Sequence, residues 1–507
     1  MGQLRSTYLN QALMRIPRRA ESVDRHSLAT TFVVAGSLSA MLQSSDHQII
    51  YGRRGTGKTH ALMYLGDYVE RCGDLAVHLD LRTIGSAGGL YSDSSLPEAQ
   101  RGTQLLVDAL EAIHEQLLAV AVEGRAADQD ALLRALDALA DAATAVEVVG
   151  EVEQETTLSE AAGADDGLEL SRTPKLSVSR RTSASAEGRF RRSGVERHHV
   201  VFGPLSRALR DVVGALGGSR LWLLLDEWSS VPLELQPMLA DLLRRSALPI
   251  QGITVKIAAI ERRARFRLPG QDGDYVGIEV GADAATAVSL DDFMVFDDAP
   301  AQARTFFQQL FHNHAVPRLT PDLRDRITSP SAFEQGAFRK NAFAELVRAA
   351  EGVPRDAINI AALAAQHAHN NPIGVEDVRR AARDWYLRDK QSAITSHTRA
   401  HQLLRALVNE VVGRRRSRTF LVDQMSDSGI LHDLYEARLL HVLRRGVVAR
   451  RNPGTLYDGF AIDYGCYVAL LLDDPGFDLP PDNFHPERSV IDLDELGRET
   501  GEPATRA

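Results

Sequence analysis

The chain has 507 residues and a formal net charge of −10, from 58 basic and 68 acidic side chains. This balance excludes a polycation, so any contact with nucleic acid must come from a local basic patch. The two cysteines, Cys72 and Cys466, exclude a disulfide framework and predict a reducing compartment, the cytoplasm. The length predicts about three domains, and no apolar run approaches the length that crosses a membrane.

The first part of the chain leads into a glycine loop. Residues 1–27 are polar and basic, and we expect them to form a separate N-terminal segment. Residues 28–42 have the pattern of a helix, and residues 47–51 have the pattern of a short buried strand. Gly52 follows that strand directly, so the glycine loop begins where the strand ends.

The glycine loop matches the phosphate-binding pattern G-x-x-x-x-G-K-[ST] at every required position. A helix is expected to begin at Lys58, so backbone N–H groups and a helix N-terminus would face one anion. Lys58 is predicted to reach the β- and γ-phosphates of ATP, and the Thr59 hydroxyl to bind Mg²⁺. A glycine-rich turn with one lysine can also be only a turn, but the flanking strand and helix favour nucleotide binding. The residues predicted to bind the cofactor are Gly52, Arg53, Arg54, Gly55, Thr56, Gly57, Lys58, Thr59 and His60.

An alternation of strands and helices predicts a parallel α/β sheet. A second strand is expected over residues 75–82 and an amphipathic helix over 104–120. Residues 124–196 interrupt this rhythm, beginning as an alanine-rich helix over 128–145 and then becoming acidic and finally rich in serine and arginine. We interpret them as a partly helical, partly disordered insertion. The insertion could dock a partner, but its composition favours a solvated loop.

The α/β pattern resumes with a helix over 205–216 and an apolar strand that ends in Asp226 and Glu227. Carboxylates at the end of a central strand face the ligand site of such a sheet. Asp226 is predicted to hold Mg²⁺, and Glu227 to act as the general base that polarises the attacking water. The alternative is a buried strand that meets an exposed acidic turn, which is less favoured downstream of a phosphate loop.

A further apolar strand is expected over residues 254–260, after a helix over 237–245. It ends in a cluster of charges that contains Glu261, Arg262 and Arg263. A cation there would lie near the γ-phosphate, although such a cluster is commonly only a solvated loop. Residues 288–296 are expected to close the sheet.

Helices dominate the next part of the chain, at 303–314, 342–351, 355–369 and 375–388, and predict a small all-α unit. Arg355 lies in the first turn of one of them, directly after a proline. The pairs His312/His314 and His367/His369 have a spacing of two, which directs their rings to different faces of a helix. They predict no metal site.

The C-terminal module combines helices over 401–412 and 431–445, a strand over 419–422, and a hairpin formed by 447–450 and 456–462. This pattern resembles a winged helix. Arginines precede the strand and surround the hairpin, which suits phosphate contacts on duplex DNA, whereas the alternative use is protein contacts. The clustered arginines are Arg414, Arg415, Arg416, Arg418, Arg444, Arg445, Arg450 and Arg451. The possible DNA contacts are Arg414, Arg415, Arg416, Arg450 and Arg451.

Together, the phosphate loop, the strand ending in Asp226 and Glu227, the strand ending in arginines, and the helical unit that opens with Gly352-x-x-Arg355 resemble an AAA+ or STAND-type ATPase. The resemblance is greatest to the origin-recognition-complex branch of bacterial AAA+ proteins. It implies an α/β P-loop sheet with a helical lid and a C-terminal winged helix. It also implies that Arg355 is the sensor-2 arginine, which reports the γ-phosphate to the lid, and that ATP drives homo-oligomer formation.

The chain departs from this family at one position. In this family the strand that corresponds to residues 254–260 is usually followed by Asn or Thr. In this chain Glu261 and Arg262 stand there instead. Arg262 or Arg263 is therefore the expected sensor, as in STAND proteins. The predicted catalytic residues are Glu227, Lys58, Arg355 and Arg262, and the predicted Mg²⁺ ligands are Thr59 and Asp226.

The predicted domains are an N-terminal segment, a P-loop core, a helical lid, a winged-helix-like domain and a flexible acidic tail. Their boundaries are 1–27, 28–300 with the insertion at 124–196, 301–392, 393–473 and 474–507. The predicted function is an ATP-hydrolysing switch coupled to assembly and to a DNA or protein partner. The alternative is a DNA- or partner-binding adaptor in which ATP is a structural ligand, and Glu227 discriminates between the two because an adaptor needs no base.

Overall fold

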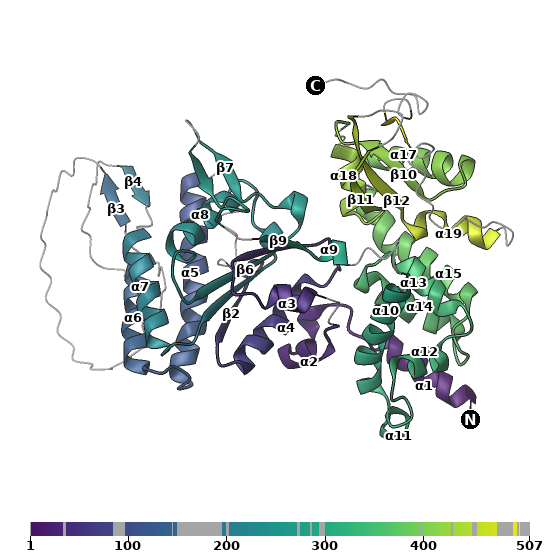
Figure 1. Cartoon of the computed structure of the whole chain (residues 1–507), viewed down its shortest axis with the longest axis horizontal. Coiled ribbons are helices and arrows are strands. Elements are labelled where there is room, and N and C mark those ends of the chain that lie inside the picture. The colour runs from purple at the N-terminus through teal and green to yellow at the C-terminus, as the bar shows by residue number, and fades with distance from the viewer. Residues whose placement is uncertain are drawn as a thin grey trace, which may run out of the picture. The chain divides into compact units, whose positions relative to one another are not determined.

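A computed structural model gives the fold of the chain (Figure 1). It describes residues 2–33, 37–84, 97–143, 146–149, 195–198, 202–270, 274–283, 286–293, 300–395, 397–426, 429–448, 454–473, 490–493 and 496. The chain divides into two compact units. One holds Gln43–Tyr51 and Leu65–Val288, and the other holds Met1–Leu42, Gly52–Tyr64 and Ser289–Ala507. The predicted domain boundaries remain predictions, and the two units are described separately.

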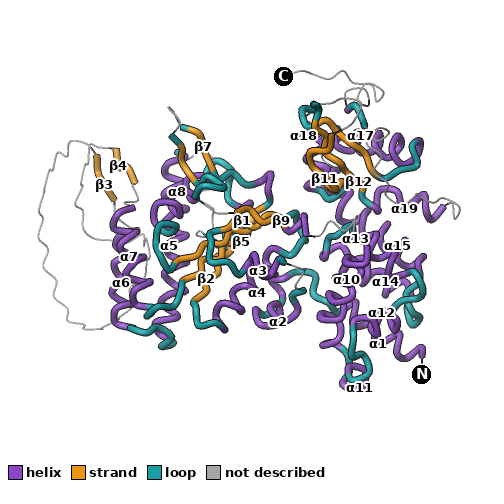
Figure 2. The backbone as a smooth tube through the Cα atoms, viewed as in Figure 1, coloured by secondary structure: helices purple, strands orange, loops and turns teal. Residues whose placement is uncertain are grey.

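The first unit, the sheet unit, is built on a five-stranded sheet with the order β2-β5-β6-β1-β9 (Figure 2). The strands β2, β5, β6 and β1 run parallel to one another. Strand β5 is buried along its whole length, which explains its continuous apolar sequence. The strands are β1 (Gln48–Tyr51), β2 (Leu75–Asp80), β5 (Leu221–Asp226), β6 (Ile253–Ala259) and β9 (Thr286–Ser289).

Long helices cover this sheet. Helix α5 packs on β2 and also contacts α6 and α8, and α7 packs against α6 and α8. Their apolar faces and the strands share one core, in which Leu105, Leu136, Leu205 and Trp228 are fully buried. The helices are α5 (Glu98–Val122), α6 (Gln129–Ala143), α7 (Phe202–Ala215) and α8 (Gln236–Ser246).

Two pairs of short antiparallel strands complete the sheet unit. Strands β7 (Arg267–Pro269) and β8 (Tyr275–Gly277) pair after β6. Strands β3 (Val146–Val149) and β4 (Val195–His198) pair across the predicted insertion. The rest of the insertion after residue 149 lies outside the described residues, so its predicted disorder is not tested.

The second unit, the helical unit, contains the helices α1 to α3, the glycine loop, the first turns of α4, and everything from α9 onward. Helix α1 packs against α10, α12 and α14 and buries Leu9, Leu13 and Ile16 in their core. Its helices include α1 (Gly2–Met14), α2 (Arg25–Thr31), α3 (Leu38–Leu42), α4 (Lys58–Arg71), α9 (Leu290–Phe293), α10 (Pro300–Ala315), α11 (Pro321–Arg324), α12 (Pro330–Ala337), α13 (Ala342–Ala350), α14 (Pro354–Ala368) and α15 (Val375–Trp385).

The chain from residue 386 onward adds a three-stranded antiparallel sheet with the order β10-β12-β11 and further helices. Two π-helical turns, Tyr386–Lys390 and Val408–Arg414, interrupt the helices before this sheet. The elements are α16 (Gln391–Ile394), α17 (Thr398–Leu407), β10 (Thr419–Asp423), α18 (Gly429–Glu436), β11 (Leu440–Val448), β12 (Leu456–Ile462) and α19 (Tyr464–Asp473).

Most expected elements are present, and the α/β sheet is confirmed, but two expected helices are wrong. The helix expected over 28–42 breaks after Thr31, where β-branched Thr30 and Thr31 weaken it and Phe32 is extended, stacking its ring on Tyr64 at 4.6 Å between centroids. The helix expected over 431–445 ends early because Arg438 takes a left-handed conformation (φ 62°). Strand β11 then begins at Leu440, seven residues before the expected hairpin strand.

The chain also forms helix α19, which the sequence pattern did not predict, and β11 is longer than expected. Residues 294–296, expected to close the sheet, lie outside the described residues, whereas β9 does form its edge. Within the part of the chain that is described, no helix combines the length and the apolar character needed to cross a membrane.

Candidate functional site

The glycine loop has a backbone conformation that depends on its glycines. Gly55 and Gly57 have φ angles of 89° and 98°, a region that favours glycine. A Cβ atom on Gly52 would lie 2.5 Å from Thr56 Oγ1, so only glycine fits there. The Thr56 hydroxyl donates to the Arg53 carbonyl at 2.9 Å and closes the turn before α4 begins at Lys58.

Lys58 lies within the curve of this loop. Its ammonium group donates to the carbonyls of Gly52 at 2.8 Å and Arg53 at 3.1 Å. Thr59 follows in the first turn of α4 and is half-buried. The lysine is therefore held by the loop backbone, next to the N–H groups at the start of the helix.

Arg53 and Arg54, the first variable residues of the loop, have opposite environments. Arg54 is exposed, whereas only 8% of the Arg53 side chain is accessible. The Arg53 guanidinium forms an ion pair with Asp291 at 2.9 Å, and its backbone N–H donates to the same carboxylate at 2.8 Å. Asp291 is therefore part of this site, although the sequence pattern gave it no role.

Helix α14 meets the loop at the residue next to its proline. The Arg355 backbone N–H donates to the Gly55 carbonyl at 3.2 Å. A Cβ atom added to Gly55 would lie 2.8 Å from the Arg355 Cβ, so the two backbones are in close contact. The structure thus brings together Arg355 and the glycine loop, two features that are about 300 residues apart in sequence and were predicted independently.

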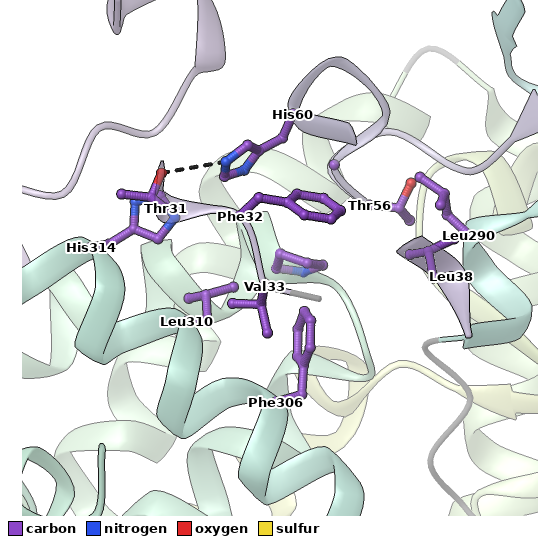
Figure 3. Close-up of a pocket in the computed structure, with 12 residues that line it drawn as sticks. Thr31, Phe32, Val33, Leu38, Thr56, His60, Leu290, Phe306, Leu310 and His314 are labelled. Carbon is purple, nitrogen blue, oxygen red and sulfur yellow. Dashed lines mark hydrogen bonds between the residues drawn. The ribbon is translucent and has the colours of Figure 1, made fainter. Parts of the chain in front are cut away.

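A pocket opens beside the loop and is lined mainly by apolar side chains (Figure 3). Its volume is about 40 Å³, so a nucleotide base would need the surrounding side chains to move. Figure 3 shows His60 above Phe32, with His314 across from it. The lining residues are Thr31, Phe32, Val33, Leu38, Thr56, Gly57, His60, Leu290, Phe306, Leu310, His314 and Pro354.

The two histidines of this pocket are neutral at physiological pH. Burial, and to a smaller extent the neighbouring His60, lower the pKa of His314 to about 3. Burial also lowers the pKa of His60, whose ring lies 5.6 Å from that of His314. His60 Nε2 lies within hydrogen-bond reach of the Leu28 carbonyl and the Thr31 hydroxyl. The pocket therefore offers apolar and neutral polar groups, as a planar heterocycle would need.

Within the sheet unit, the end of β5 carries Asp226 and Glu227. Asp226 is buried, and its carboxylate accepts the Glu227 backbone N–H at 2.8 Å. Glu227 has left-handed backbone angles, φ 56° and ψ 38°, which are uncommon for a residue other than glycine. Such strain persists where the surrounding structure enforces it, and it is concentrated at functional sites.

Two residues at the end of β2 join this pair of carboxylates. Asp80 is the register partner of Asp226 on the neighbouring parallel strand. Arg82 forms ion pairs with Asp80 at 2.6 Å and with Glu227 at 3.9 Å. Burial alone would raise the pKa of Asp80, but its hydrogen bonds with Arg82 hold the pKa below the usual value. Neither residue was predicted to belong to the site, although the Asp-x-Arg pattern at the end of an apolar run indicates such a pair.

A buried amide fixes the turns after β5 and β6 against each other. Gln236 donates to the carbonyls of Val231 at 2.9 Å and Arg263 at 3.1 Å, and its Oε1 accepts the Trp228 indole N–H at 3.2 Å. Ile260 N–H also donates to the Ser229 hydroxyl at 2.9 Å. The turn that contains Arg262 and Arg263, both exposed, therefore lies beside the turn that contains Glu227.

The C-terminal arginines have different environments. Arg414 and Arg415 are exposed or half-exposed and pair with Glu410 at 2.8 and 2.9 Å. Arg418 is buried in an ion pair with Glu351, so its predicted place in an exposed cluster is wrong. Arg416 is exposed and has a φ of 51°, and Arg444 and Arg445 are exposed on β11, whereas Arg450 and Arg451 lie outside the described residues.

The histidine pairs have separate surroundings. His314 lines the pocket described above, and His367 Nε2 lies within hydrogen-bond distance of Asp384 Oδ2, at 3.0 Å. Among the described residues, no group of three or more His, Cys, Asp or Glu side chains is arranged to hold a metal ion.

The comparisons with known proteins find a likeness among solved structures. No protein-family model matches the chain, and no curated protein matches it in sequence. Among solved structures, the chain is similar to the Aeropyrum pernix Orc1 protein in complex with DNA, with a TM-score of 0.33 and 12% sequence identity. That alignment covers 89% of this chain and 97% of the other.

Proposed function

We propose that the chain is an ATP-binding and ATP-hydrolysing switch of the AAA+/STAND kind. The observation that carries the proposal is the conformation of the glycine loop at the start of α4, with its two left-handed glycines and Lys58 held at its centre. A run of backbone N–H groups at a helix N-terminus is a general anion site, and the loop sequence is the one that binds nucleotide phosphates.

The catalytic roles follow from the residues at the ends of the strands. β1 ends at Tyr51, the residue before the loop, and lies parallel to β6, which is parallel to β5. The carboxyl ends of these strands therefore share one edge of the sheet, which supports a common role for the loop, Asp226 and Glu227. Glu227 would accept a proton from the attacking water, and its fixed backbone would hold the carboxylate in place.

The residues fit a magnesium nucleotide. The Thr59 hydroxyl and the Asp226 carboxylate are hard oxygen donors of the kind that Mg²⁺ prefers, and together they would hold the ion. When bound, Mg²⁺ neutralises phosphate charge. Lys58 would bind the phosphates from within the loop, and the pocket lined by Phe32 and His60 would receive the base.

Two arginine positions would report the nucleotide state. The Arg355 backbone already contacts the loop through Gly55, which supports a sensor role for its side chain. Arg262, or its neighbour Arg263, would sense the γ-phosphate from the turn that Gln236 fastens beside Glu227. We keep Arg262 as the catalytic candidate.

Measured ATP turnover tests this proposal. The wild-type protein with Mg²⁺ is expected to release inorganic phosphate continuously, and omission of Mg²⁺ is expected to stop the release. Tight ATP binding with no turnover, with or without duplex DNA, would instead favour the alternative adaptor in which ATP is a structural ligand. Absence of ATP binding by calorimetry would overturn both readings.

DNA binding is a second candidate function, favoured by the exposed Arg444 and Arg445 on β11, by Arg416, and by the helices and three-stranded sheet that suit a winged helix. Neutralising Arg444 and Arg445 together is expected to lower the slope of log affinity for duplex DNA against log salt by about two, because each phosphate contact contributes roughly one unit. Fluorescence anisotropy across a salt series measures that slope.

The matched control neutralises Arg207 and Arg210, which are exposed on α7 of the sheet unit. It removes the same amount of positive charge as the test variant. An equal loss of slope in both variants would mean that net charge alone governs binding. No DNA binding by the wild-type protein at low salt would move the C-terminal module to protein contacts. A variant in which Arg450 and Arg451 are both neutralised is tested with the same salt series and the same control.

A further inference from the structure

A chain of buried polar side chains begins in the glycine loop and runs through the C-terminal module. We call it the buried relay, and it consists of Arg53, His441, Asp463, Lys390 and Asp356. Side-chain exposure is 8% for Arg53, 3% for His441, 1% for Asp463, 2% for Lys390 and 0% for Asp356. None of these residues except Arg53 has a role in the proposed phosphate site.

The first link joins the loop to strand β11. Arg53 Nη1 lies 2.8 Å from His441 Nδ1, and the guanidinium also lies over the Tyr435 ring of α18 at 5.0 Å. A guanidinium can only donate hydrogen bonds, so Nδ1 must accept. The neutral imidazole therefore carries its proton on Nε2, from which it donates to Asp463 at 2.9 Å.

The tautomer of His441 fixes which group donates and which accepts in each of its two hydrogen bonds. Burial, and the neighbouring Arg53 cation, lower the pKa of His441 to about 4, so the ring stays neutral. A second proton would place an N–H group against the N–H group of Arg53. His441 thus bridges a cation in the loop and an anion at the end of β12, because it accepts a hydrogen bond from Arg53 and donates one to Asp463.

The second half of the relay returns toward the loop. Lys390, at the end of a π-helical turn, binds Asp463 and also Asp356, the latter at 2.9 Å. Asp356 also pairs with Arg438, which precedes β11. Asp356 is the neighbour of Arg355, whose backbone N–H donates to Gly55. The relay therefore leaves the glycine loop at Arg53 and comes back to it at Gly55.

The residues of the buried relay cannot change their contacts one at a time. Each of its charges is buried, and a buried charge that loses its partner is strongly unfavourable, so a shift at Arg53 must be followed along the chain. Phosphate binding requires the loop N–H groups, and the Arg53 N–H is at present donated to Asp291. Nucleotide binding in the loop would thus act directly on the first member of the relay.

We propose that the buried relay couples nucleotide occupancy of the glycine loop to the conformation of β11 and β12, with His441 as its positioning residue. This inference rests on the proposed function, since it needs a nucleotide in the loop. By linkage, whatever binds the C-terminal module would change nucleotide affinity by the same factor.

Hydrogen exchange of the full-length protein, with and without ATP and with and without ADP, tests the inference. Nucleotide is expected to change the exchange rates of residues 440–448 and 456–462 in the wild-type protein. His441→Leu breaks both hydrogen bonds, and is expected to remove this change and to weaken nucleotide binding about 5- to 150-fold, the usual range of coupling between sites. His441→Gln, which can accept from Arg53 and donate to Asp463, is expected to restore both.

The control is Arg418→Met, which breaks the similarly buried ion pair between Arg418 and Glu351 but does not touch the relay. It is expected to lower stability while keeping the nucleotide-dependent change in exchange. If His441→Leu does not fold, His441→Asn replaces it, since it can keep only the bond to Arg53. Nucleotide binding with no exchange change in wild-type β11, or a change that persists in His441→Leu or His441→Asn, overturns the inference and leaves the proposed function intact. A wild-type protein that binds no nucleotide overturns both.

Discussion

The Glu227→Gln protein is expected to bind ATP with the affinity of the wild type and to hydrolyse it about 10²–10⁴ times more slowly. The substitution removes the base but keeps the size of the side chain and its hydrogen-bonding capacity. The left-handed backbone of residue 227 costs the same for glutamine as for glutamate, so the turn after β5 should persist. Binding uses the loop and Asp226, which the change does not touch.

Single-turnover phosphate release and ATP calorimetry measure the two quantities separately. The control is Glu261→Gln, the same substitution at an exposed carboxylate in the turn after β6. It is expected to leave turnover within a few-fold of the wild type, because its carboxylate has no proposed role. Hydrolysis at the wild-type rate by Glu227→Gln would refute the catalytic role of this residue.

The Glu227→Gln protein held in its ATP state also tests assembly. In related NTPases an arginine supplied by a neighbouring subunit accelerates hydrolysis by about 10³–10⁵, so we propose that ATP favours a homo-oligomer. Light scattering should then give a larger mass with ATP than with ADP. A trapped protein that stays monomeric would leave the ATPase proposal intact and remove the assembly proposal.

Lys58→Ala is expected to abolish nucleotide binding. The lysine is the cation at the centre of the loop, held there by the carbonyls of Gly52 and Arg53. The neighbouring Arg53 cannot replace it, since its guanidinium is engaged with Asp291. A ligand at 100 times its Kd raises the free energy of unfolding by about 2.7 kcal/mol. The wild-type melting temperature should therefore rise with ATP, and that of the variant should not.

The matched control for this variant is Arg54→Ala, which removes the same charge from an exposed position of the same loop. It is expected to retain the thermal shift with at most a modest loss of affinity. Unchanged ATP affinity of Lys58→Ala in calorimetry would contradict the assignment of the phosphate loop.

The parts of the fold that were predictable from sequence are those set by local pattern. The apolar run before Asp226 is typical of a buried strand. The conformation of the glycine loop depends on its own glycines and not on contacts with distant residues. Residues 440–445 were wrongly predicted as helix because leucine and valine suit a helix or a strand. Pairing with β12 made them a strand, and that pairing is a tertiary contact.

The candidate site divides in the same way. Lys58, Asp226 and Glu227 could be predicted from motifs because such motifs lie within a few neighbouring residues. The ion pair of Arg53 with Asp291 and its link to His441 join residues that are far apart in sequence, so no local pattern contains them. For the same reason, Gln236 reads as an ordinary helix residue until the turns that it joins are known.

The paired strands β3 and β4 set the cost of the long interruption in the sheet unit. Val149 and Val195 are register partners, so the chain leaves and re-enters the unit at neighbouring backbone positions. The entropy of closing a loop rises only with the logarithm of its length, about 0.6 kcal/mol for each doubling. Evolution could therefore lengthen or shorten residues 150–194 severalfold at a cost smaller than that of one poorly packed core side chain.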